Sequence, residues 1–243
     1  MLAPMYVRKR TLLAAVALAL SLGAATLAYA IPGATACSLV GIARLHPLAD
    51  GTLVEAGTSE QDQHKLQDLI VAAKSRIENT FGAPRAKPTL IFFRDPRTFW
   101  WLKVNPYGST NFVGSRACVI VGARGLSTDV LAHELMHAEL ADRVGYWRRF
   151  TEIPVWFDEG IAMQVDRRPR FALPPGAQVD TSYVRQLQSA RSFFQANEQQ
   201  LVRNYASAGA EVAHWLSDVG PQSLYPRLDR IAHGEQFDSV LRK

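Results

Sequence analysis

Residues 127–145 read STDVLAHELMHAELADRVG, and the rest of the chain can be placed around this stretch. Ser127 can cap a helix at its start, Asp129 suits the positive end of that helix, and Gly145 offers a C-terminal stop. Apolar residues lie on nearly every side of the expected helix, which is typical of a buried helix. Polar side chains inside such a helix need partners, because burying them without hydrogen bonds costs free energy.

The central motif of this stretch is His133-Glu134-Leu135-Met136-His137. Two histidines four residues apart lie on one face of an α-helix, so both imidazoles can reach one metal ion. The glutamate beside them can accept a proton from a water molecule that the ion activates. The same residues would also fit a buried helix whose polar side chains form a hydrogen-bonded network without a metal. A third ligand elsewhere in the chain would favour the metal.

A second apolar helix is expected over residues 155–163, with Pro154 at its first turn. Glu159 lies in this apolar setting, and a glycine follows it directly. Asp158 or Glu159 could instead cap the helix or pair with one of the nearby arginines. Because this helix follows the two-histidine motif, we interpret Glu159 as the third metal ligand.

Together the two stretches resemble the gluzincin metallopeptidases. In the aminopeptidase-like branch of that clan, H-E-x-x-H is followed by a helix that reads W-x-x-E-G-x-A, which residues 156–162 match. The resemblance implies a zincin-like domain built around an active-site helix. It also implies that His133, His137 and Glu159 bind Zn²⁺ and that Glu134 is the catalytic base.

One position departs from the thermolysin-like relatives. Those proteins carry an aspartate four residues beyond the ligand glutamate, and it supports a histidine, whereas Met163 stands at that position here. The partners of the two histidines must therefore come from elsewhere in the chain. Glu159 also follows His137 by 22 residues, a spacing that an expected loop at residues 146–153 would absorb.

The resemblance continues beyond the two expected metal helices. Residues 205–216 are similar to a helix whose tyrosine polarises the substrate carbonyl, a role that Tyr205 would take here, although Tyr183 is also available. Residues 117–121 resemble the edge strand that pairs with the substrate backbone in this clan. Residues 228–241 resemble the closing helices of small gluzincin-like exported proteins.

The remaining pattern predicts an α+β fold. Apolar residues at helical spacing indicate a helix over residues 59–81. Residues 89–93 and 111–122 are typical of strands, and residues 98–102 of a short helix. Strands precede helices here instead of alternating with them, which favours a small mixed sheet packed against a mostly helical half.

The first 30 residues predict either a signal peptide or an N-terminal membrane anchor. A basic cluster at residues 8–10 precedes a charge-free run over residues 11–30, which ends in a small-x-small cleavage pattern. The run is also long enough to span a bilayer and could serve as a membrane tether. Because the basic residues come first, the rest of the chain is expected outside the cytoplasm, in the periplasm or the extracellular space.

Residues 31–58 show little periodicity and are interpreted as a linker with a short extended piece at residues 51–57. The metallopeptidase domain is expected over residues 59–243. Cys37 and Cys118 are the two cysteines of the chain, and in an exported protein they can pair. Cys37 lies near the expected processing site, however, and could equally stay free.

The charge balance argues against nucleic acid as a partner. The 243 residues carry a formal net charge of +5, but three of the positive charges lie at residues 8–10. Without them, 24 Lys and Arg residues face 22 Asp and Glu residues. No basic stripe with interleaved aromatic residues is present, so a peptide or protein substrate is the expected partner.

The sequence therefore predicts an exported, zinc-dependent peptidase. In this prediction Glu134 moves the proton, and Tyr205 helps the metal to stabilise the oxyanion. One alternative is an exported zinc-binding scaffold that binds a protein partner without cleaving it, although all three ligands and Glu134 are present. Another alternative is a zinc hydrolase that acts on a non-protein amide, such as one in a cell wall.

Overall fold

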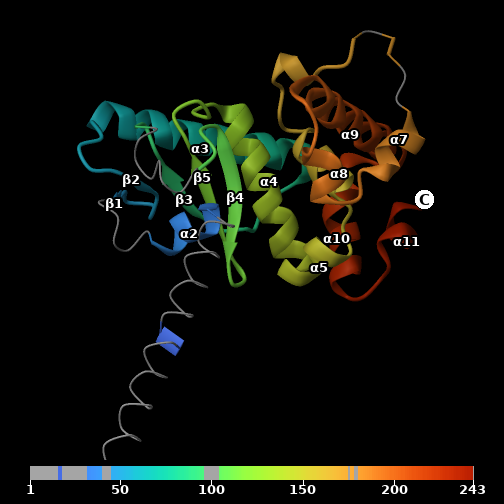
Figure 1. Ribbon diagram of the computed structural model, residues 1–243, viewed down its shortest axis with the longest axis horizontal. Helices are drawn as coiled ribbons and strands as arrows, with labels where there is room; N and C mark the ends of the chain where they lie inside the picture. Colours follow the sequence, from blue (N-terminus) through green and yellow to red (C-terminus); the bar gives the residue numbers. More distant parts are fainter. Residues whose placement is uncertain are drawn as a thin grey trace, which may run out of the picture.

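The computed structural model has an α+β architecture in which a mixed β-sheet lies beside a larger group of helices (Figure 1). It describes residues 16–17, 32–39, 45–95, 104–174, 176–177 and 180–242. The expected short helix at residues 98–102 lies outside this part of the chain, and so does nearly all of the N-terminal segment 1–30. Among the described residues, no helix combines the length and the apolar character needed to cross a bilayer.

The sheet has five strands in the order β1-β2-β3-β5-β4. Their bounds are Leu45–Pro47, Leu53–Glu55, Thr89–Phe92, Gly108–Val113 (β4) and Arg116–Val121 (β5). The central strand β3 runs parallel to β2 and to β5, and the two outer pairs are antiparallel. The sheet is therefore mixed, as the sequence predicts.

The edge strand beside the two-histidine helix is β4. The prediction that residues 117–121 form this edge is wrong, because β5 lies between β3 and β4. A tight turn at residues 114–115 folds β4 back along the outer side of β5. The inner strand β5 is buried over residues 118–121, whereas most of β4 is only partly buried.

Two faces of the sheet pack against different helices. Leu90, Phe92, Val119 and Val121 point to the larger core, which α3 (Glu60–Phe81) and α4 (Thr128–Val144) complete. The alternate residues of β3 and β5 pack against α2 (Pro32–Ser38) on the opposite face. The alternation follows from the two-residue period of a strand.

The helical half follows α4 in the chain. It comprises α5 (Tyr146–Thr151), α6 (Val155–Ala162), α7 (Thr181–Gln186), α8 (Ala190–Phe194), α9 (Glu198–Val219), α10 (Leu224–Ala232) and α11 (Phe237–Leu241). Short 3-10 turns lie at Pro169–Phe171 and Pro221–Ser223. The expected helices at residues 59–81, 127–144 and 155–163 are all present.

Two segments are more ordered than the sequence suggests. The expected loop at residues 146–153 contains the helix α5. Residues 32–39 and 45–58, interpreted as a linker with an extended piece, contribute α2 and the strands β1 and β2. Neither segment has enough apolar periodicity of its own to reveal that it packs on the domain.

A disulfide joins Cys37 of α2 to Cys118 of β5. The two cysteines are 81 residues apart, so the bond closes a long loop and fixes α2 on the sheet. Closing a loop of this length restricts the unfolded chain and stabilises the fold by about 2–4 kcal/mol.

Replacing Cys37 with serine should therefore lower the free energy of unfolding by about 2–4 kcal/mol, measured by urea denaturation without reductant. Adding reductant should bring the wild-type midpoint down to that of the Cys37→Ser variant and leave the variant unchanged. Equal midpoints for the two oxidised proteins would show that the bond does not stabilise the fold.

Candidate metal centre

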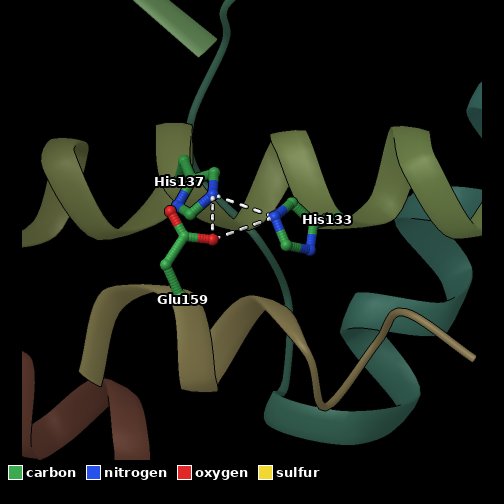
Figure 2. Close-up of side chains that lie close together, drawn as sticks. All are labelled: His133, His137 and Glu159. Carbon is green, nitrogen blue, oxygen red and sulfur yellow. Dashed lines mark hydrogen bonds and ion pairs between the residues drawn. The ribbon is translucent and has the colours of Figure 1, made fainter. Parts of the chain in front are cut away.

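The helix α4 positions both histidines of the motif. The Ser127 hydroxyl accepts a hydrogen bond of 3.2 Å from the backbone N–H of Val130, and the helix ends at Gly145, whose φ is 89°. This left-handed φ favours glycine. Between these caps the helix is buried on almost every side. One of its faces meets α6, and the two imidazoles lie on that face (Figure 2).

Three side chains from two helices converge at this interface. His133 and His137 of α4 face Glu159 of α6, and all three are buried (Figure 2). Nε2 of His133 lies 3.1 Å from Nε2 of His137, and Glu159 Oε2 lies 3.3 and 3.5 Å from these two nitrogens. Ligand atoms of a tetrahedral ion with bonds of about 2.0–2.1 Å are about 3.3–3.4 Å apart. The triangle therefore has the dimensions of a metal site.

The outer nitrogens of both rings face carboxylates. His137 Nδ1 lies 2.6 Å from Asp158 Oδ1, and His133 Nδ1 lies 3.3 Å from Asp166 Oδ2. Carboxylates in these positions favour a proton on Nδ1, so each neutral ring turns the lone pair of Nε2 into the triangle. Glu159 Oε2 adds a third electron-rich atom, and no hydrogen bond from the described residues satisfies it. These atoms fit together around a cation.

Arginines neutralise the two supporting carboxylates. Asp158 Oδ2 lies 2.6 Å from Arg149 Nη2. This confirms the expectation that Asp158 could pair with a nearby arginine. Asp166 accepts from Arg168 Nε at 2.9 Å and from Arg168 Nη2 at 2.5 Å. All four side chains are buried or largely buried. The two pairs therefore orient the imidazoles without adding net charge.

Within the part of the chain that the structure describes, the carboxylates of Glu159 and Glu134 have no arginine partner at this site. Both residues are buried, with 7% and 8% of their surface exposed. Two buried negative charges are expensive unless a counter-charge lies close to them. With neutral imidazoles, a divalent cation would balance this pair.

The raised pKa values of the two histidines also indicate that positive charge is favoured at this site. Burial alone would lower the pKa of His133, but its contacts with Asp166 and Glu159 outweigh burial and raise that pKa to about 9. Burial opposes protonation of His137 as well, yet Asp158 and Glu159 raise its pKa well above the usual range. Protons and a metal ion would compete for the same nitrogens, so metal affinity should fall as the pH is lowered.

A close helix contact sets the position of Glu159. Its neighbour Gly160 packs against α9 so tightly that a Cβ there would lie 2.6 Å from the Ala208 carbonyl oxygen and 2.5 Å from the Val212 side chain. A larger residue at position 160 would push α6 away from α9. The glycine of the W-x-x-E-G-x-A pattern therefore has a packing role beside the ligand.

Glu134 is held against the edge strand. The Thr110 hydroxyl lies 2.8 Å from Glu134 Oε2 and 2.7 Å from the Glu134 backbone oxygen. Gly108 of the same strand lies so close that a Cβ would be 3.1 Å from Glu134 Oε1. The carboxylate thus lies between the two-histidine helix and β4.

Tyr205 lies at the site, and Tyr183 does not. The ring of Tyr205 packs on His133 with 6.0 Å between ring centroids. Burial, reinforced by the charges of Glu159 and Glu134, raises the pKa of Tyr205 well above its usual value. Tyr183 instead bonds to Asn204 and Gln200 of α9. Of the two tyrosines, Tyr205 is the one near the triangle.

A pocket of about 290 Å³ opens beside Tyr205. Polar and charged residues line one part of it, namely Gln164, Asp166, Arg167 and Arg168. Besides Tyr205, the other lining residues are small or apolar, namely Met163, Phe171, Ala172, Leu173, Ala206, Gly209, Ala210 and Ala213. The pocket therefore adjoins the triangle through two residues that contact His133.

The sequence alone did not reveal the partners of the imidazoles. Because Met163 replaces the aspartate of the thermolysin-like relatives, the sequence implied only that these partners lie elsewhere. The structure shows that they are Asp158 and Asp166. Asp158 directly precedes the candidate ligand Glu159, and that adjacency is the one sequence signal that could have identified it. Asp166 and Arg168 lie beyond the end of α6, where no pattern marks them.

Comparisons of the chain with protein-family models, with curated proteins and with solved structures found no match. The gluzincin resemblance thus rests on the two motifs and on the triangle that they form.

Replacing Asp158 with asparagine should weaken metal binding about 10- to 100-fold, because the imidazole of His137 loses its charged partner. Isothermal titration with Zn²⁺ would measure the affinity, and circular dichroism would check the fold. The matched control is Asp142→Asn, which alters an exposed ion pair with Arg85 at the end of α4. Equal affinities in the two variants would contradict the orienting role of Asp158.

Proposed function

We propose that this protein is a zinc-dependent metallopeptidase. The observation that carries the proposal is the buried triangle of His133, His137 and Glu159 with Glu134 beside it. Two imidazoles and one carboxylate are a donor set typical of catalytic zinc, which keeps a further position open. A zinc ion bound there would act as a Lewis acid and lower the pKa of a water molecule.

Glu134 is the proposed general base. Thr110 engages Oε2 of its carboxylate, which leaves Oε1 available to accept a proton. The same oxygen can later return the proton to the leaving amine. A carboxylate fixed on one side needs little reorganisation for this transfer.

Tyr205 is the proposed donor to the oxyanion. Its raised pKa keeps the phenol protonated at neutral pH, so its hydroxyl can donate a hydrogen bond. A donor placed where negative charge develops stabilises the transition state. Its position on α9 against His133 supports this role.

The edge position of β4, which pairs with no further strand among the described residues, supports a peptide as the substrate. Gly122 N–H donates to the Tyr107 carbonyl at 3.0 Å, and bonded pairs alternate along an antiparallel ladder. The backbone groups of Gly108, Thr110 and Phe112 consequently point to the open edge. An extended peptide could add to this edge through backbone hydrogen bonds, next to Glu134. A non-peptide amide would not use these groups in the same way.

The pocket beside Tyr205 supports a preference for an apolar side chain. Its lining is mostly small and apolar, and a volume of about 290 Å³ suits one large side chain. We infer that a substrate paired with β4 would place an apolar residue near this pocket.

Replacing Glu134 with glutamine should leave about one zinc per chain and reduce turnover of quenched-fluorescence peptides by about 10²- to 10⁴-fold. Metal analysis and initial rates would be measured on the same preparations. The Glu159→Gln variant should instead lose both zinc and activity, because a ligand is altered. Wild-type protein that holds zinc but cleaves no peptide in a broad library would favour the non-cleaving scaffold.

Replacing Tyr205 with phenylalanine should lower kcat by about 10²- to 10³-fold while zinc content stays unchanged, since one donor to the oxyanion is lost. Tyr183→Phe is the matched control, because it removes a phenol bonded within the helical half. Similar rates for the two variants would rule out a role for Tyr205 in the reaction.

A further inference from the structure

Three arginines stand close together in the chain just beyond α6. They are Arg167, Arg168 and Arg170, and we call residues 167–170 the arginine segment. The first two line the pocket beside Tyr205, and the third lies in the adjoining 3-10 turn. The reaction proposed above leaves most of this positive charge without a role. Arginines beside a pocket are well suited to hold a carboxylate, because the planar guanidinium can donate two parallel hydrogen bonds to it.

A buried ring holds the arginine segment beside the candidate oxyanion donor. Phe171 ends the 3-10 turn and is 4% exposed. The centroid of its ring lies 5.0 Å from that of Tyr205. The guanidinium carbons of Arg168 and Arg170 lie over the Phe171 ring, 4.8 and 4.4 Å from its centroid. Cation–π contacts at these distances are attractive, so the ring holds both guanidiniums near Tyr205.

In the part of the chain that the structure describes, two of the three arginines have no carboxylate partner. Arg168 forms the ion pair with Asp166. Neither Arg167 nor Arg170 forms an ion pair with the described residues, and both side chains are exposed. A divalent cation in the triangle would already balance the two buried carboxylates that lack an arginine. The charges of Arg167 and Arg170 are therefore available to an anionic group of a ligand.

The arginine segment also reaches the start of the edge strand. The guanidinium carbon of Arg170 lies 5.7 Å from the ring centroid of Tyr107. Tyr107 directly precedes Gly108, the first residue of β4, and a Cβ on Gly108 would lie 3.1 Å from Glu134 Oε1. A peptide that pairs with the edge of β4 would therefore come close to Arg170 at the end of the strand that lies beside Glu134.

We propose that the arginine segment is a carboxylate subsite of the candidate peptidase. It binds a carboxylate of the peptide within about three residues of the cleaved bond, or roughly 10 Å of extended chain, at the Gly108 end of β4. The carboxylate belongs either to an Asp or Glu side chain or to the C-terminus of the peptide. The apolar side chain inferred for the pocket belongs to a neighbouring residue of the same peptide. This inference rests on the proposed function and names the class of peptide that the site takes.

The test uses pairs of blocked peptides that differ only in Glu or Gln at one position, with each position near the cleaved bond taken in turn. A further pair compares a free C-terminal carboxylate with its amide, which separates the two sources of the carboxylate. Fluorescence anisotropy with zinc-loaded Glu134→Gln protein measures affinity without turnover, and kcat/KM is measured with the wild type. We expect the carboxylate to tighten binding by about 10-fold, as is typical of a charge-assisted hydrogen bond.

The double variant Arg167→Gln/Arg170→Gln should reduce this preference to less than about twofold, because both available guanidiniums are lost. Arg203→Gln is the matched control and should keep the preference. Arg203 is also an exposed arginine over a tyrosine ring, with its guanidinium carbon 5.1 Å from the centroid of Tyr183, which does not lie at the site.

Peptide cleavage without any gain in affinity from a carboxylate would overturn the subsite and leave the proposed function standing. A preference that persists in the double variant would also overturn it, because another group, such as the metal ion, would then hold the carboxylate. A preference that the double variant loses, in a wild-type protein that binds these peptides but cleaves none, would support the subsite and contradict the proposed hydrolysis.

Discussion

Two imidazole nitrogens and one carboxylate oxygen are held 3.1–3.5 Å from one another in the interior of this protein, and a cation or shared protons would offset their repulsion. They belong to His133, His137 and Glu159, which two helices bring together. The surrounding arrangement follows from this constraint. Asp158 and Asp166 orient the rings, and Arg149 and Arg168 keep those carboxylates from adding charge of their own.

The same centre joins the two halves of the fold. The helix α4 belongs to the layer that covers the sheet, and α6 belongs to the helical half. Glu134 extends the connection to the edge strand through Thr110, and Tyr205 extends it to α9. The candidate groups for proton transfer and for oxyanion stabilisation therefore come from different elements: Glu134 lies against the edge strand, and Tyr205 lines the pocket.

Local sequence signals predicted the α+β class, the principal helices and the three candidate ligands that converge. The caps of α4 and the spacing of its histidines are encoded within a few residues, so they can be read directly. The edge position of β4 could not be read, because its side chains are only partly buried and lack a strong apolar pattern. Two contacts depend on how distant segments of the chain pack, namely those of Asp166 with His133 and of Cys37 with Cys118. Local sequence patterns carry no information about such packing.

The close contact at Gly160 joins α6, which carries the candidate ligand Glu159, to α9. Because no side chain separates α6 from α9 at this point, the two helices cannot slide or separate without losing direct van der Waals contact. Glu159 and Tyr205 consequently lie on two helices in direct contact, whereas the two histidines lie on α4. A displacement of α6 and α9 as a pair would therefore move the Glu159 carboxylate and the Tyr205 phenol together relative to the imidazoles, and it would separate the three candidate ligands.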